Sequence, residues 1–132
     1  MMLRFSLLFL AVGTAACNTS ESCDCVPLPD HDVEITQGAP SKGPNAFSPS
    51  NIVISLASQT TVTWLNQDFS GTGPYGGGSG VTHRLVSNDG TTFTSGNIAS
   101  NGTYTATLSA PGTYGYHCSI HPGMTGTVTV DP

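Results

Sequence analysis

The stretch PGTYGYHCSIHPGMTGTVTV, residues 111–130, has the pattern of two β-strands joined by a tight turn. Before the turn, Tyr116 and Cys118 stand two positions apart, and after it Val128 and Val130 do the same. Because successive side chains of a strand point to opposite faces, the members of each pair share one face. The stretch therefore predicts two half-buried strands that contribute to a common core.

The same alternation recurs along the rest of the chain, outward from this stretch. Strands are predicted at residues 32–36, 51–58, 60–66, 81–87, 101–110, 113–118 and 124–130. Residues 37–50 are expected to form a Gly/Pro/Ser loop, and residues 69–80 a glycine-rich hairpin insertion. That insertion does not fit a phosphate cradle, which needs a following helix and a lysine. Short strands without a convincing helix predict an all-β, Greek-key β-sandwich of seven to eight strands.

The composition limits the classes of function. Charged residues make up only 8% of the 132 residues, and the formal net charge is −5. With no basic patch in the sequence, nucleic-acid binding is excluded, whereas an acidic domain suits a basic protein partner. The length corresponds to one domain after removal of a leader.

The N-terminus, MMLRFSLLFLAVGTAAC, has the three parts of a secretory signal peptide. Arg4 supplies the positive charge, residues 5–12 an apolar run too short to span a bilayer, and residues 13–16 a small-residue end. The end resembles a bacterial lipobox, in which Cys17 would be lipidated and become the new N-terminus. Thr14 replaces the usual leucine, so cleavage by an ordinary signal peptidase stays open. We expect a signal peptide at 1–16 and a periplasmic, membrane-tethered lipoprotein.

Residues 17–31 are polar and proline-containing, which predicts a flexible tether ahead of a folded domain at 32–132. Cys23 and Cys25 lie in this tether and form a candidate disulfide pair in an oxidising compartment. Such a short loop is tight. The alternative is a second thiolate site for Cu(I), with His31 as the one nearby ligand.

Strand parity decides which chemical groups can meet. His83 shares a face with Leu85 and points inward, as Cys118 does at the end of its own strand. His121 and Met124 lie on the turn that follows Cys118, so all four groups can converge at one end of the sandwich. Alone, a core histidine is more often a structural residue, and a buried cysteine a small apolar filler. Together, two His, one Cys and a weak axial Met form the type-1 copper ligand set.

Here the sequence resembles the small cupredoxins of the plastocyanin and amicyanin family. The resemblance covers residues 32–130 and includes VTWLNQD around Trp64, VTHRLVSNDG (81–90) and the short Cys-x2-His-x2-Met spacing typical of amicyanin-like members. It implies that His83 and His121 bind copper through ring nitrogens, Cys118 as a thiolate and Met124 as a distant axial sulfur. Arg84 departs from the family, which often has Asn or Thr after the first histidine. The brace between the ligand loops is therefore expected to be missing or different.

The resemblance implies a monomeric single-electron carrier with a transient redox protein partner and no enzymatic activity. His121, among Ile120, Pro122 and Gly123, is the expected exit for the electron, and any membrane contact would be through the lipid. Three alternatives stay open. A copper-delivery protein would have the same ligands, an enzyme domain would need a second histidine cluster that His31 and His117 do not form, and a metal-free adhesion sandwich would leave the ligand grouping unexplained.

Overall fold

The computed structural model describes residues 28–70 and 79–132. The expected signal peptide, Cys17, Cys23 and Cys25 lie outside these residues, as do residues 71–78 of the glycine-rich loop. Within the described part of the chain, no helix is both long enough and apolar enough to cross a membrane.

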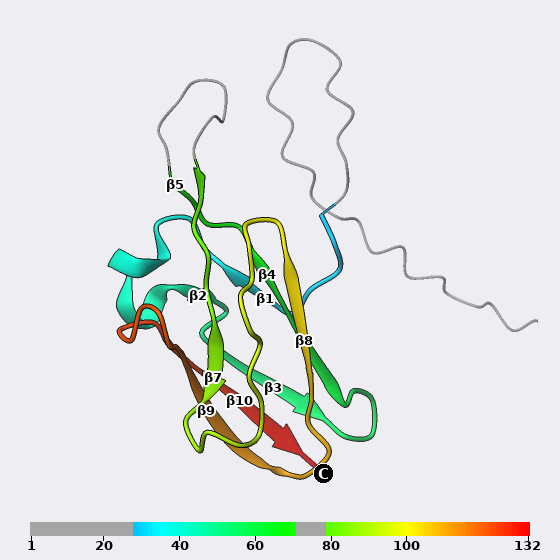
Figure 1. Ribbon diagram of the computed structural model, residues 1–132. Coiled ribbons are helices and arrows are strands. Elements are labelled where there is room, and N and C mark those ends of the chain that lie inside the picture. Colours follow the sequence, from blue (N-terminus) through cyan, green and yellow to red (C-terminus); the bar gives the residue numbers. More distant parts are fainter. Residues whose placement is uncertain (1–27, 71–78) are drawn as a thin grey trace, which may run out of the picture.

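Two four-stranded sheets form a β-sandwich (Figure 1). The first sheet has the order β2-β1-β4-β8 and consists of β1 (Val33–Ile35), β2 (Phe47–Ser48), β4 (Thr61–Asn66) and β8 (Thr103–Thr107). The second has the order β3-β10-β9-β7 and consists of β3 (Asn51–Ser55), β7 (Leu85–Ser87), β9 (Gly112–Cys118) and β10 (Thr125–Asp131). Both sheets are mixed, because β1 pairs with β4, and β3 with β10, in parallel. The prediction of an all-β sandwich is confirmed.

The segment between β1 and β3 is more ordered than the predicted loop at 37–50. It contains two 3-10 turns, η1 (Ala39–Ser41) and η2 (Gly43–Asn45), in addition to the short strand β2. A proline stands near the start of each turn, where its missing N–H removes no internal hydrogen bond. The loop prediction was wrong in this respect, because a Gly/Pro/Ser composition suits short turns and open coil equally.

The ends of the glycine-rich insertion pair as a small antiparallel ladder. Here β5 (Phe69–Ser70) lies beside β6 (Ser79–Gly80). The prediction of a hairpin insertion therefore agrees with the part of this loop that the structure describes.

An aromatic cluster fills the space between the sheets. The Trp64 ring lies 5.3 Å from that of Tyr116, 5.5 Å from that of Phe93 and 5.8 Å from that of Tyr104, measured between centroids. Offset and edge-on contacts of this kind add to the burial of apolar area. Trp64 is fully buried, as the alternation predicts, but so is Leu65 on the opposite parity. The end of β4 is thus covered on both faces, which strand alternation does not reveal.

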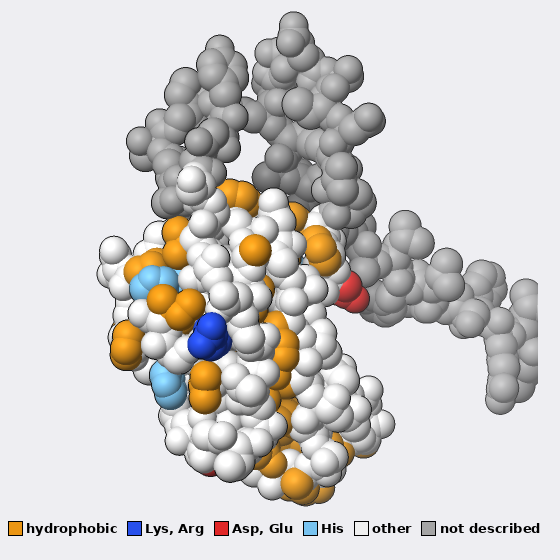
Figure 2. All heavy atoms as spheres, viewed as in Figure 1, with side chains coloured by type: hydrophobic (Ala, Val, Ile, Leu, Met, Phe, Trp, Pro, Cys, Tyr) orange, Lys and Arg blue, Asp and Glu red, His pale blue; other side chains and the backbone are white. Residues whose placement is uncertain are grey.

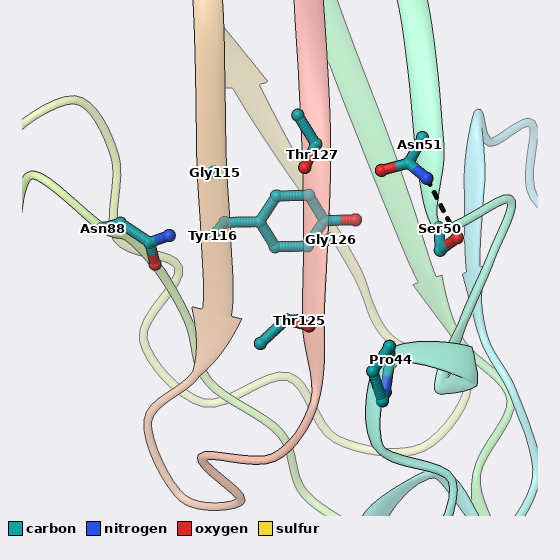
Figure 3. Close-up of a pocket in the computed structure, with 9 residues that line it drawn as sticks. All are labelled: Pro44, Ser50, Asn51, Asn88, Gly115, Tyr116, Thr125, Gly126 and Thr127. Carbon is teal, nitrogen blue, oxygen red and sulfur yellow. Dashed lines mark hydrogen bonds between the residues drawn. The ribbon is translucent and has the colours of Figure 1, made fainter.

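Gly126 makes room for one ring of this cluster. The Tyr116 ring lies across β10 at Gly126, its partner in the neighbouring strand (Figure 3). A Cβ atom at position 126 would come within 2.4 Å of that ring, so the packing requires glycine there. Tyr116 stands two residues before Cys118, and its fixed position helps to hold the end of β9.

Candidate metal centre

The end of β9 and the turn between β9 and β10 (residues 119–124) carry three of the predicted site residues. Cys118 ends β9, and its N–H donates to the Met124 carbonyl at 3.0 Å. The Met124 N–H donates in turn to the His121 carbonyl at 3.0 Å. These two bonds close the turn, which lies beside the η1 and η2 segment (Figure 1). These backbone bonds therefore fix the Cα positions from which the thiol, the imidazole and the thioether extend.

His83 reaches the same place from the other side. It precedes β7 and forms an isolated bridge with Ile98, with N–H to carbonyl distances of 3.1 and 2.7 Å. The predicted strand at 81–87 is thus shorter in the structure, since pairing with β9 begins only at Leu85, opposite Cys118. Both backbone bonds of His83 are thus made to Ile98, and its side chain is fully buried.

The three ligand atoms form a compact triangle. Cys118 Sγ lies 3.7 Å from His83 Nδ1 and 3.7 Å from His121 Nδ1, and the two ring nitrogens are 3.3 Å apart. The point equidistant from all three lies about 2.1 Å from each, which is close to ordinary metal–imidazole lengths of about 2.0–2.1 Å. The donor set therefore fits a single metal ion bound by two nitrogens and one sulfur.

Burial differs among the four predicted site residues. Cys118, His83 and Met124 are fully buried, whereas His121 is half-buried. A soft thiolate and two imidazoles in a dry setting, with a buried methionine on the same turn, suit copper in preference to hard cations that take oxygen ligands. The four residues are positioned as a type-1 copper site.

Electrostatics favour the thiolate form of Cys118. Burial opposes ionisation, but hydrogen bonds from His83 and from the N–H of Arg84, which donates to Sγ at 3.5 Å, lower the pKa of the Cys118 thiol to about 6. For His83, burial likewise opposes the charged form, while Cys118 and then Asp68 raise the pKa above its ordinary 6.5. The deprotonated sulfur that a metal needs is thus present at neutral pH.

In the metal-free chain, we expect the Cys118 thiolate absorbance to appear with a midpoint that reflects a pKa of about 6. Because the folded state holds the thiol below its ordinary pKa of 9.0, this group stabilises the fold most above that value. Its contribution is lost as pH falls towards about 6. The measurement is an ultraviolet pH titration of the chain minus that of a Cys118→Ser variant. A midpoint of the difference near the ordinary value would contradict the geometry.

The main chain ties the two ligand-bearing segments together at Arg84. The Ser119 N–H donates to the Arg84 carbonyl at 2.8 Å, and the Arg84 side chain is exposed and donates to Asn97 Oδ1 at 2.7 and 3.1 Å. The predicted difference in the brace between the ligand loops therefore concerns the side chain at position 84 alone, because the main chain still connects the two loops. His117 is half-buried, and its Nδ1 lies 2.8 Å from Asn88 Oδ1, so it takes no part in the triangle of ligand atoms.

One residue of the site is absent from the sequence prediction. Asp68 Oδ2 lies 2.9 Å from His83 Nε2, and both side chains are buried. Asp68 follows the end of β4, where the strand alternation no longer applies. A lone Asp after a strand usually faces solvent, so the residue type alone does not indicate a buried role. The one available signal in the sequence was its position two residues after Asn66.

The pocket drawn in Figure 3 lies apart from this chemistry. It is lined by small and polar side chains together with Tyr116, and none of the four predicted site residues lines it.

Fold and site together define the class. An all-β sandwich that gathers two imidazoles, a thiolate and a buried methionine at one end is a cupredoxin.

The comparisons with known proteins agree. The family described as copper binding proteins, plastocyanin/azurin family, matches residues 33–131. A plastocyanin from Scenedesmus fuscus is 32% identical over 111 residues, covering 75% of this chain and 99% of that protein. The solved structure of a purple cupredoxin from Nitrosopumilus maritimus has a TM-score of 0.61 and 29% identity, covering 77% of this chain and 100% of that one. A reduced Cu(I) form of an amicyanin mutant, 20% identical, shares the fold with a TM-score of 0.53 over 77% of this chain and 84% of that one.

The chain therefore belongs to the plastocyanin/azurin family of copper-binding proteins. The predicted family and the predicted copper cofactor are confirmed at this level.

Proposed function

We propose that this chain is a small type-1 copper protein that carries single electrons between redox partners outside the cytoplasm, and that it is not an enzyme. The observation that carries the proposal is the triangle of His83 Nδ1, Cys118 Sγ and His121 Nδ1, with sides of 3.3 to 3.7 Å. Its family membership supports the same function.

Each proposed ligand has a distinct role. His83 and His121 bind copper through Nδ1, Cys118 binds as the thiolate, and Met124 is the weak axial ligand. Copper in such a site cycles between Cu(I) and Cu(II) by single electrons. The chain holds the ligands in one arrangement through the β7–β9 pairing and the closed turn, so the geometry changes little between the two states.

The proposed route for the electron is through His121, the half-buried ligand. Ile120 beside it is 45% exposed, and Pro122 and Gly123 are exposed as well. On the face drawn in Figure 2, hydrophobic side chains lie near histidines and few side chains are charged. A small apolar surface of this kind suits brief docking of a redox protein, with an interface at the low end of the usual size range.

The proposed location follows from the leader. The signal peptide at 1–16 directs export, a lipid on Cys17 anchors the chain, and residues 17–31 act as a tether with Cys23 and Cys25 as the candidate disulfide. The domain at 32–132 then works in the periplasm as a monomer. Mass spectrometry of the exported protein tests this. A lipidated N-terminal cysteine is expected, whereas an unmodified N-terminus would rule out the anchor.

The central test is a titration with one equivalent of Cu(II), followed by visible and EPR spectra. Strong absorption in the red with a narrow hyperfine splitting is expected, because a thiolate bound to Cu(II) in a trigonal site produces both. A Cys118→Ser variant, which keeps the shape and loses the sulfur, should show neither signal. Weak colour, together with easy transfer of Cu(I) to a chelator, would favour the copper-delivery alternative instead.

A Met124→Leu variant should retain the intense colour and shift the reduction potential upwards. The axial bond is weak, so its loss leaves the trigonal ligands in place. The site then has one donor fewer, which suits Cu(I) better than Cu(II), because Cu(II) prefers the higher coordination number. Leucine and methionine have similar volumes, so packing should cost less than about 1.5 kcal/mol. Voltammetry of both proteins measures the shift, and an unchanged potential would show that the Met124 sulfur does not face the metal.

A further inference from the structure

Asp68 is a buried acidic side chain that the copper ligand set does not include. It follows β4, is 1% exposed, and places Oδ2 2.9 Å from His83 Nε2. The other ring nitrogen of His83, Nδ1, faces Cys118 Sγ and His121 Nδ1. The imidazole of His83 thus lies between a carboxylate on one side and the metal triangle on the other.

The carboxylate is held firmly in this position. The Gly38 N–H donates to Asp68 Oδ1 at 2.6 Å, and the Asp68 N–H donates to Asn66 Oδ1 at 2.9 Å. The Val81 N–H donates to the Asp68 carbonyl at 3.0 Å. Two of these bonds fix the backbone of Asp68, and the bond from Gly38 fixes the carboxylate, so the side chain cannot turn away from His83 without losing the Gly38 bond.

The residue that orients Asp68 is itself fixed. Asn66 is fully buried, and its Nδ2 donates to the carbonyls of Val81 at 2.8 Å and Ile98 at 3.0 Å. Val81 stands two residues before His83, and Ile98 forms the isolated bridge with His83. Asn66 therefore positions the carboxylate and the histidine backbone relative to each other.

We propose that Asp68 is a positioning residue for the copper site, which fixes the metal-binding tautomer of His83 and favours Cu(II) over Cu(I). This inference rests on the proposed copper site. A carboxylate can only accept, so His83 Nε2 carries the hydrogen and Nδ1 keeps the lone pair that a metal requires.

The effect on copper follows from charge. A buried negative group interacts more strongly than an exposed one, and it stabilises the ion of higher charge. Among the described residues, the one ion-pair partner of Asp68 is His83, and the Arg84 guanidinium is engaged with Asn97 instead. In the part of the chain that the structure describes, no Lys or Arg forms an ion pair with Asp68. The negative charge of this carboxylate therefore favours Cu(II).

The test compares Asp68→Asn with Asp131→Asn in the full chain. Both changes remove one negative charge, but Asp131 is exposed at the far end of β10 from Met124. For Asp68→Asn, we expect the ratio of Cu(II) to Cu(I) affinity to fall at least tenfold, which raises the reduction potential by about 59 mV for a one-electron couple. Asp131→Asn should leave the potential unchanged. Equal potentials in the two variants would overturn the proposal.

A second measurement needs no copper. Nitrogen NMR of the metal-free chain at alkaline pH, where the His83 ring is neutral, should show the single Nε2–H tautomer, and Asp68→Ala should give a mixture of tautomers. If Asp68→Ala does not fold, Asp68→Asn replaces it, because the amide keeps the shape and can also donate to Nε2. A Nδ1–H tautomer in the unaltered chain would overturn the positioning role. Failure of the chain to form a blue site would refute the proposed function. The NMR measurement would still test whether Asp68 fixes the tautomer of His83.

Discussion

Replacement of His83 by alanine is expected to weaken Cu(II) binding by more than about 100-fold and to remove the intense visible band. Loss of a group that merely orients a ligand costs about 10–100-fold in metal affinity, so loss of a ligand should cost more. With His83 Nδ1 gone, Cys118 Sγ and His121 Nδ1 remain 3.7 Å apart, and the third corner of the triangle is vacant. Isothermal titration and visible spectra of the variant measure both effects.

The same change has a cost in stability that can be separated from the loss of copper. In His83→Ala, the Asp68 carboxylate would stay buried without its partner at 2.9 Å, a loss of about 1–3 kcal/mol or more. A domain stabilised by about 5–15 kcal/mol should still fold. The double variant His83→Ala/Asp68→Asn is the matched control, since it should recover stability without recovering copper. Retention of the blue band in either variant would show that His83 is not a ligand.

Strand alternation predicts the parts of the site that lie within regular strands. Tyr116 and Cys118 share a face in β9, and both are fully buried. The turn after Cys118 is short, so the positions of His121 and Met124 follow from their spacing. This is why the sequence alone leads to the type-1 ligand set and to the sandwich.

Alternation is uninformative where a strand ends or where a segment pairs on both sides. Asp68 lies beyond β4, and its burial depends on Gly38 from the segment after β1 and on His83 from the segment before β7. Asn66 is buried because Val81 and Ile98 cover the end of β4. These contacts join positions 15 to 32 residues apart, and no local periodicity encodes them. The carboxylate was therefore visible only in three dimensions.

The contrast between His83 and Asp68 has a physical basis. A metal ligand is a rare residue type at a recognisable spacing, whereas a residue that orients a ligand can be any group that accepts a hydrogen bond. His83 could be identified by its type and its parity with Leu85. Asp68 could be identified only by the 2.9 Å distance to the ring.

Truncation of Trp64 to alanine is expected to lower the free energy of unfolding by about 3–5 kcal/mol. Trp64 is fully buried between the sheets, and its ring contacts those of Tyr116, Phe93 and Tyr104. Because small domains are stabilised by about 5–15 kcal/mol in total, the loss is a large share of the stability. Urea unfolding of the metal-free chain, followed by circular dichroism, measures it. Fluorescence does not serve here, because the chain has one tryptophan.

Trp64→Phe is the matched control for the cavity. The indole Nε1 of Trp64 has no hydrogen-bond partner among the described residues, so phenylalanine removes volume without breaking a polar contact. We expect it to cost about 1 kcal/mol, in the range of ordinary single substitutions. A loss for Trp64→Ala that is no larger than the loss for Trp64→Phe would mean that the core closes over the gap. In that case the aromatic cluster would not hold β9, and with it Cys118, against the first sheet.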